Sequence, residues 1–143
     1  MVSKIDRLVK EFCAKSNLFD FAKEITDLIV KIQSDNADVS CCDTCETSVI
    51  EQNTDRKNMI RISFKYGKDN SIHYLWDLLH EYGHHLSGQP KNRNIDINRE
   101  IEAWNNGMNY LKRIPSLLKH LADYENYRDK CLDSYKKHIK PSA

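Results

Sequence analysis

The segment DLLHEYGHHL, residues 77–86, places three histidines and one glutamate within ten residues. His80 and His84 are four residues apart, so on a helix both imidazoles lie on one face and can reach the same ion. Glu81 lies about 100° around the helix from His80, which is too far for a third ligand but suits a base acting on a nearby water. The pattern predicts a helix with two metal ligands and one base. A chance match on a solvated helix face is the alternative.

The residues around these histidines predict a helix over residues 70–87 with two distinct sides. The side opposite the histidines carries Leu75, Leu79, Tyr82 and Leu86. This arrangement predicts that one side packs in the core while the other side holds a metal ion. Gly83 has no side chain, so a neighbouring element can approach the helix closely there.

A zinc site needs a third protein ligand, because two histidines alone bind weakly. The segment NREIEAWNNGMNYL, residues 98–111, offers Glu100 and Glu102. Glu100 lies at the edge of the apolar side of a helix, in line with the small residues Ala103 and Gly107, whereas Glu102 points the other way. We therefore expect Glu100 to be the third ligand and Glu102 to lie in water.

Two other interpretations of this segment stay open. Glu100 could instead be a boundary carboxylate that pairs with Arg99 or Lys112. Asp96 is a weaker candidate for the third ligand.

HEYGH at residues 80–84, followed by EIEAW at residues 100–104, resembles the gluzincin metallopeptidases. Among these the chain is most similar to the ImmA/IrrE group, which carries HExGH and a later ExEA. The resemblance covers about residues 58–111, and Trp104 stands where that group more often has a small polar residue. It implies that Glu100 is the ligand from the second helix, in agreement with the helix geometry.

The function expected from these residues is that of a zinc-dependent endopeptidase. His80, His84 and Glu100 hold Zn²⁺ with water as the fourth ligand, and the ion lowers the pKa of that water from about 15.7 toward about 7. Glu81, as general base, takes the proton and passes it to the leaving amine. The alternative is a non-catalytic, zinc-stabilised binding or regulatory module with the same fold.

Other residues are candidates for roles around such a site. A second donor for the oxyanion is usual in this family, and the candidates are His85, His120, Tyr124 and Tyr127. His73 lies two turns before His80 and is expected to line the cleft.

The 143 residues are enough for one domain, 1–143, and too few for two. We expect a mostly helical α+β fold with a small antiparallel sheet of two or three strands beside the histidine helix. Its parts are N-terminal helices in 1–36, the sheet in 39–67, and helices over 70–87, 96–113 and 115–139. Apolar residues alternate with polar ones in NMIRISFKYG, residues 58–67, which predicts a strand whose edge could pair with an extended peptide.

Charge and composition limit the kinds of partner that the chain is expected to have. The chain has 22 basic and 21 acidic side chains, so no strong field favours nucleic acid or an anionic membrane. The start, MVSKIDRLVKEF, is amphipathic and lacks the apolar run of a signal peptide. We expect a cytoplasmic protein with a protein or peptide substrate, no direct nucleic-acid partner and no membrane, and its oligomeric state stays open.

The five cysteines fit free thiols better than a closed disulfide framework, because their number is odd. Cys13 and Cys131 lie on apolar helix faces and are expected to act as small hydrophobic residues. Cys41, Cys42 and Cys45 form a cluster in SCCDTCE. Three interpretations of this cluster stay open, namely unremarkable thiols, a redox or second metal site, and a thiolate that blocks the catalytic zinc.

Overall fold

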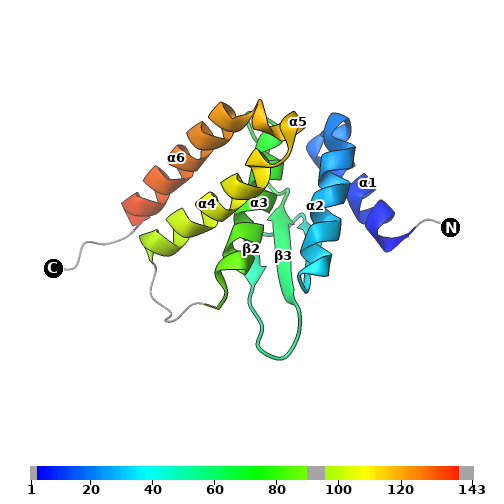
Figure 1. Cartoon of the computed structure of the whole chain (residues 1–143), viewed down its shortest axis with the longest axis horizontal. Coiled ribbons are helices and arrows are strands. Elements are labelled where there is room, and N and C mark those ends of the chain that lie inside the picture. The colour runs from blue at the N-terminus through cyan, green and yellow to red at the C-terminus, as the bar shows by residue number, and fades with distance from the viewer. Residues whose placement is uncertain (1–2, 90–95, 139–143) are drawn as a thin grey trace.

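The computed structural model describes residues 3–89 and 96–138 and confirms a mostly helical α+β fold (Figure 1). Its elements are α1 (Lys4–Ser16), a 3₁₀ turn η1 (Phe19–Phe21), α2 (Ala22–Ser34), β1 (Ala37–Cys42), β2 (Val49–Glu51), β3 (Asn58–Ser63), α3 (Ile72–Ser87), α4 (Ile97–Lys112), α5 (Pro115–Leu118) and α6 (Leu121–His138). In Figure 1, α1 and α2 lie on one flank of α3 and the sheet, and α4 and α6 lie on the other. No helix in the described ranges is long and apolar enough to cross a bilayer.

The first helix begins and ends at polar residues suited to those positions. The backbone N–H of Asp6 donates to Ser3 Oγ at 3.1 Å, which caps the N-terminus of α1. Asn17 ends α1 in a left-handed conformation, with φ at 60°, a conformation that asparagine tolerates better than most residues. Asn17 therefore terminates the first helix.

The sheet is mixed, which corrects the expectation of a purely antiparallel one. Among the described residues its strand order is β1-β3-β2. β2 and β3 form the expected antiparallel hairpin, but β1 pairs with β3 in parallel, with Val39 opposite Ile60. The reason lies in burial, because Ile60 and Ile62 are both fully buried, and a strand in the middle of the sheet buries them better than one at an edge.

The central place of β3 also removes it as a docking edge for a peptide. Both of its sides are occupied by β1 and β2, so the expectation that this strand pairs with substrate is wrong. β2 (Val49–Glu51) is the edge strand on the α3 side instead. The segment that joins β1 to β2, residues 43–48, must cross the carboxyl end of β3 to get there.

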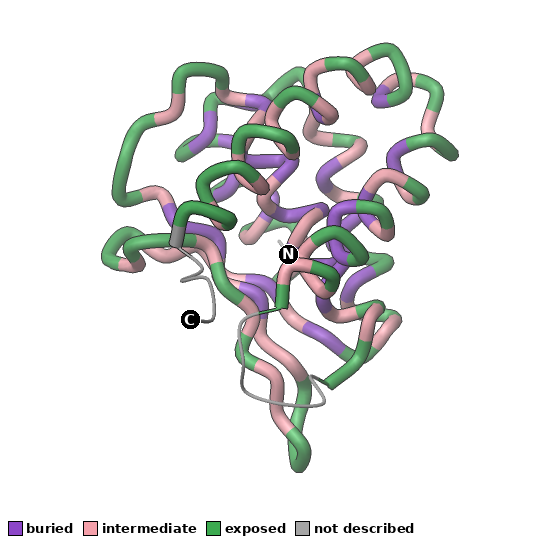
Figure 2. Tube along the Cα trace, turned by 90° about the vertical axis from the view of Figure 1, so that its left-hand side faces the viewer, coloured by how far each residue is buried: buried purple, intermediate pink, exposed green. Residues whose placement is uncertain are grey.

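α3 lies at the centre of the molecule and is buried on almost every side (Figure 2). The Asn70 side chain accepts from the Ile72 N–H at 3.2 Å, as expected for a capping residue at this end. Leu75, Leu79 and Tyr82 pack in the core as predicted, but Leu86 is 48% exposed. Leu86 lies in the last turn of α3, beyond the elements that cover the rest of this face.

α3 and α4 make the most extensive contact between elements. A Cβ placed on Gly83 would lie 1.9 Å from the carbonyl oxygen of Ala103, and one on Gly107 would lie 3.0 Å from that of Leu79. Position 83 therefore requires glycine, as the sequence predicted, and position 107 leaves little room for a side chain. This close approach brings the histidine face of α3 against α4.

The last predicted helix, 115–139, is broken into two. Pro115 occupies the first turn of α5 as expected, since its missing N–H costs nothing there. The chain then turns at Lys119 and His120, and α6 runs back along α4 (Figure 1), where Tyr124 donates to the carbonyl of Trp104 at 2.6 Å. Residue 139, where the helix was expected to end, lies outside the described residues.

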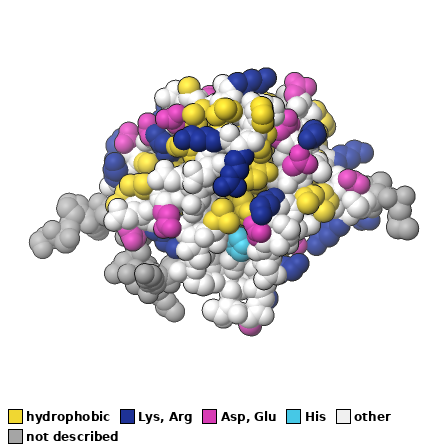
Figure 3. All heavy atoms as spheres, viewed as in Figure 1, with side chains coloured by type: hydrophobic (Ala, Val, Ile, Leu, Met, Phe, Trp, Pro, Cys, Tyr) yellow, Lys and Arg dark blue, Asp and Glu magenta, His cyan; other side chains and the backbone are white. Residues whose placement is uncertain are grey.

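The face of the molecule shown in Figure 3 carries basic and acidic side chains interspersed with apolar ones. This distribution agrees with the near-neutral formal charge of +1. Many of the charges are paired, for example Arg61 with Glu51 at 2.9 Å on the sheet.

Candidate metal centre

Three of the predicted ligands converge between α3 and α4. His80 Nε2 lies 2.7 Å from Glu100 Oε2, and His84 Nε2 lies 2.9 Å from the same oxygen. One ligand atom from each residue lies within 4.8 Å of the others. The three residues, called the metal cluster below, are therefore close enough to bind one metal ion.

The surroundings of the metal cluster hold its side chains in place. The Trp104 ring stacks on the His80 ring with centroids 4.1 Å apart and an interplanar angle of 6°. Trp104 is 2% exposed, and Tyr124 holds its backbone carbonyl, so it forms a rigid wall. Stacking thus orients the His80 imidazole, the task that outer-shell partners perform for metal-binding histidines. Trp104 therefore has a structural use at this site.

The protonation states of the cluster suit a cation. Burial lowers the pKa of His80, although the neighbouring Glu100 carboxylate raises it. Burial raises the pKa of Glu100, but hydrogen bonds from His80 and His84 outweigh it and bring the pKa to about 2. An ionised carboxylate beside a neutral imidazole is the combination that a metal ion needs.

Glu81 lies beside the cluster and does not join it. Its side chain is 7% exposed, and its Oε1 lies 3.5 Å from His80 Nδ1, the ring nitrogen that faces away from Glu100. Burial raises the pKa of Glu81 well above its usual value, and the carboxylates of Glu100 and Asp77 raise it further. A nearby cation would act in the opposite direction and favour the ionised carboxylate.

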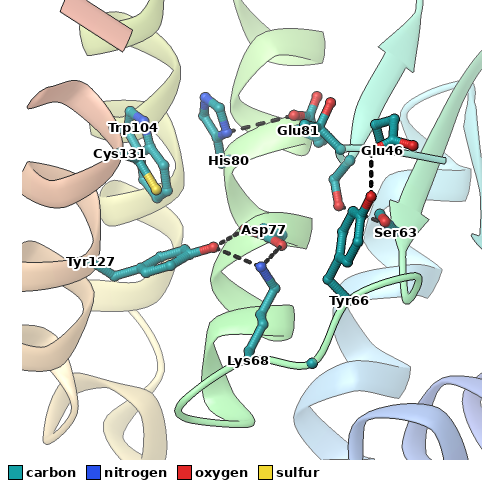
Figure 4. A pocket seen from close by; sticks show the side chains of 13 residues that line it. Glu46, Ser63, Tyr66, Lys68, Asp77, His80, Glu81, Trp104, Tyr127 and Cys131 are labelled. Atoms are coloured by element: carbon teal, nitrogen blue, oxygen red, sulfur yellow. Dashed lines mark hydrogen bonds and ion pairs between the residues drawn. The ribbon is translucent and has the colours of Figure 1, made fainter. Parts of the chain in front are cut away.

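A cleft of about 270 Å³ opens next to His80 and Glu81 (Figure 4). α4 and α6 form one wall with Trp104, Tyr127 and Cys131. The opposite wall comes from the sheet, the segment that precedes β2 and the loop that follows β3, and it carries Glu46, Thr47, Ser48, Ser63 and Tyr66. A ligand in this cleft would contact Glu81 and, of the metal cluster, His80.

A scan of family models, a search of curated proteins and a search of solved structures each found no match to this chain.

The sequence did not predict the polar group at the floor of the cleft. Tyr127 Oη donates to Asp77 at 2.6 Å, and Lys68 Nζ lies 3.1 Å from Asp77 and 3.1 Å from Tyr127 Oη (Figure 4). Asp77 lies one turn before His80 on α3, so helix periodicity could have identified it. Lys68 carries no such signal, because only the folded chain brings its loop to this place.

The other residues with predicted roles divide into those that line the cleft and those that pack against neighbouring rings. Tyr127 lines the cleft, and Cys131 beside it is half-buried rather than fully packed in the core. Tyr124 is fully buried on Trp104, so packing accounts for it. The His120 ring packs on the Phe21 ring, with the centroids 5.5 Å apart.

The remaining histidines and acids lie away from the cleft. His73 stacks on Tyr127 with the ring centroids 4.1 Å apart. It lines a separate, shallower pocket, so the expectation that it lines the main cleft is wrong. His85 is bound by Asn58 and the backbone of Asp35. Asp96 caps α4 by accepting from Asn98 N–H at 2.9 Å, and Glu102 is exposed as predicted.

The cysteines differ from the expectation of free thiols. Cys42 and Cys45 form a disulfide, while Cys13, Cys41 and Cys131 are free. Cys13 is buried and packs in the core as predicted. None of the three clustered cysteines is among the described residues that line the cleft, so nothing supports a cysteine of this cluster on the metal.

Proposed function

We propose that this chain is a zinc-dependent endopeptidase of the gluzincin type. The observation that carries the proposal is the convergence of His80, His84 and Glu100 on one point, with Glu81 beside them at the end of a cleft. The two segments that resemble the ImmA/IrrE group, residues 80–84 and 100–104, are the two that meet there. A chance match of the sequence pattern would not require them to meet.

Zinc is the metal that this set of donors favours. Two imidazole nitrogens and one carboxylate oxygen form a mixed set of the kind found in catalytic zinc sites. Magnesium and calcium prefer sets made of oxygen atoms alone. When bound, zinc supplies a Lewis acid that polarises a carbonyl and makes a water molecule acidic.

The chain itself supplies the proton transfer and the binding surface. Glu81 accepts the proton of the attacking water and returns it to the amine that leaves when the peptide bond breaks. Lys68 lines the same cleft, and its ammonium group has three N–H donors, of which two are directed at Asp77 and Tyr127 and the third is available to a substrate carbonyl. Burial and the adjacent Asp77 raise the pKa of Tyr127, so the phenol keeps the proton that it donates to Asp77.

An extended peptide is the substrate that the site favours. The edge strand β2 follows directly after Ser48, which lines the cleft, so a peptide could pair with β2 through main-chain hydrogen bonds. Such pairing selects for extended backbone more than for particular side chains. We propose the cytoplasm as the compartment because Cys13, Cys41 and Cys131 are free, and there the Cys42–Cys45 disulfide meets thiols that can reduce it.

The decisive experiment compares the wild type with Glu81→Gln. Both proteins are loaded with zinc and incubated with a peptide library, and the products are identified by mass spectrometry. Glu81→Gln should keep zinc and the fold but lose cleavage by about 100-fold or more, since it removes the general base.

Glu102→Gln is the matched control, because Glu102 is exposed on α4 and should leave cleavage unchanged. Zinc binding without cleavage by the wild type would leave the non-catalytic binding module as the function. Absence of zinc binding would overturn both.

A further inference from the structure

Residues 43–48 build one wall of the cleft by crossing the carboxyl end of β3. Ser63, the last residue of β3, holds this crossing at two points. Its Oγ donates to the Cys45 carbonyl at 2.5 Å, and its backbone N–H donates to Ser48 Oγ at 2.9 Å. Tyr66 donates to Glu46 at 2.7 Å (Figure 4). The position of this wall therefore depends on a few anchors in a segment without regular secondary structure.

The Cys42–Cys45 disulfide is the covalent anchor of that wall. Cys42 is the last residue of β1, so the bond ties the start of the crossing to the end of the strand. Asp43 and Thr44, the two residues inside the ring, are exposed to solvent. Cys42 and Cys45 are themselves partly exposed, so a small thiol can approach the disulfide from outside.

The two sulfur atoms have different environments. The backbone N–H of Cys45 donates to Cys42 Sγ at 3.1 Å, and the Thr44 hydroxyl lies 3.7 Å from the same sulfur. Because a sulfur in a disulfide has no proton, the hydroxyl is the donor in this contact. Donors directed at one sulfur stabilise negative charge on it, so Cys42 is the better leaving group when the bond is broken.

The free thiols are poor competitors for this exchange. Burial raises the pKa of Cys41 to about 12, and Glu11 raises it further. Burial likewise raises the pKa of Cys131 to about 11. Both stay protonated near neutral pH, and the thiolate is the reactive form.

We propose that Cys42 and Cys45 form a thiol–disulfide exchange site for low-molecular-weight thiols, and that its redox state sets the order of the cleft wall at residues 43–48. A thiolate RS⁻ attacks Cys45 Sγ, the Sγ–Sγ bond breaks, and Cys42 leaves with the electron pair. A second RS⁻ attacks the sulfur of the bound R group, which gives RSSR and releases Cys45. Two electrons come from the two thiols, and each cysteine takes up one proton.

Reduction removes the covalent anchor and leaves the crossing held by side-chain hydrogen bonds and by the ion pairs of Asp43 with Lys15 and of Glu46 with Lys65. The main consequence falls on Glu46, Thr47 and Ser48, which line the cleft. The metal cluster lies on α3 and α4 and shares no residue with the crossing. Exchange at the disulfide therefore changes the cleft wall and leaves the metal ligands in place.

The first test equilibrates the full chain in glutathione buffers of graded reduced-to-oxidised ratio. After acid quenching, free thiols are alkylated under denaturing conditions and located by mass spectrometry. The expected count is three at the oxidising end and five at the reducing end, with the change confined to Cys42 and Cys45. Five thiols in every buffer, or pairing with another cysteine, would overturn the proposal.

The second test measures amide hydrogen exchange in both redox states of the wild-type chain. Reduction should speed exchange in residues 43–48 by about tenfold or more while exchange in α3 stays the same. Cys41→Ser is the matched control and should leave the difference intact. Equal exchange in the two states would show that the disulfide does not order the wall.

Single-cysteine variants test the asymmetry. Cys42 in Cys45→Ser should react with iodoacetamide about threefold faster, or more, at pH 7 than Cys45 in Cys42→Ser. The reverse order would contradict the assignment of Cys42 as the leaving group. All three readouts are independent of peptide cleavage, so they stand or fall separately from the proposed peptidase activity.

Discussion

His84 and His85 are adjacent on α3, yet they belong to two different polar clusters. His84 faces α4 in the metal cluster, where His84 Nε2 and His80 Nε2 approach the same oxygen of Glu100. His85 faces the other way, into a group with Asp35, Asn58 and Tyr82 that is called the Asp35 cluster below. Adjacent residues on a helix point in different directions, so the two histidine side chains meet different surroundings.

The hydrogen bonds of the Asp35 cluster are complementary. His85 Nε2 donates to the Asp35 carbonyl at 2.8 Å, so its Nδ1 can accept from Asn58 Nδ2 at 2.9 Å. Tyr82 donates to the Asp35 carboxylate, and this bond helps to keep the pKa of Asp35 below its usual value. Every polar atom of His85 therefore has a partner within the protein, and no ion is needed.

The metal cluster differs in its convergence on one point. Both imidazole Nε2 atoms approach the same oxygen of Glu100, and the buried Glu81 carboxylate next to them lies 3.5 Å from His80 Nδ1. The Asp35 cluster spreads its hydrogen bonds over separate partners, whereas the metal cluster directs three possible ligand atoms at one place. The comparison distinguishes the two histidines more clearly than burial does.

The largest effect is expected where α3 and α4 meet. Gly83→Ala places a Cβ 1.9 Å from the Ala103 carbonyl oxygen, so the helices must separate. The free energy of unfolding should fall by about 3 kcal/mol or more, and metal binding should be lost. Urea denaturation and metal titration measure the two effects.

Gly67→Ala is the matched control, because a Cβ at Gly67 meets nothing within 4 Å. It should change the free energy of unfolding by less than about 0.5 kcal/mol. Similar stability of the two variants would show that α3 and α4 are not as close as described.

The next largest effect is on zinc affinity, and it distinguishes Glu100 from Glu102 on α4. Glu100→Ala should weaken zinc binding by about 100-fold or more, since it removes one of three ligands. Glu102→Ala should leave zinc affinity unchanged, because its side chain is exposed. Competition with a chromophoric chelator measures both affinities, and the opposite order would exclude Glu100 as a ligand.

His84→Ala and His85→Ala test the comparison directly. His85→Ala should lower the free energy of unfolding by about 2 kcal/mol through two lost hydrogen bonds, and zinc should still raise its Tm. His84→Ala should abolish the rise of Tm with zinc. Thermal unfolding with and without zinc measures both, and loss of the zinc effect in His85→Ala would place it in the metal site.

The smallest effect concerns the stability of the metal-free protein. Burial raises the pKa of Glu81, so ionisation of Glu81 favours the unfolded chain, and stability falls as the pH rises above the usual glutamate range. Glu81→Gln removes this cost and should stabilise the metal-free protein at pH 7 by about 1 kcal/mol or more.

The gain should shrink toward pH 4, where Glu81 is protonated in both folded and unfolded chains. Urea denaturation from pH 4 to pH 7 measures it. A variant that is less stable than the wild type at every pH would contradict the burial of this carboxylate.

Much of the metal cluster was predictable because it depends on local geometry. Helical periodicity places His80 and His84 on one face of α3 and separates Glu100 from Glu102 on α4. Gly83 signalled the close approach of a second helix. The sequence did not reveal that Trp104 covers His80, because stacking depends on how the two helices are placed.

The sheet and the cleft were less predictable because they depend on contacts between distant segments. The strand within residues 58–67 was identified from alternation, but alternation does not say which strand of a sheet is central. The parallel pairing of β1 with β3 follows from burial of Ile60 and Ile62 among the helices. The same pairing makes residues 43–48 cross β3 and form a wall of the cleft.

By itself, the sequence determined most of the helices, the strand within residues 58–67 and the side chains that can bind a metal, because these follow from the spacing of residues along a regular backbone. Only the tertiary structure decided that Lys68, Asp77 and Tyr127 meet on the cleft floor and that Cys42 pairs with Cys45. Such contacts are selected by the packing of the whole core, in which each segment takes the position that buries most apolar surface and leaves fewest polar atoms without partners.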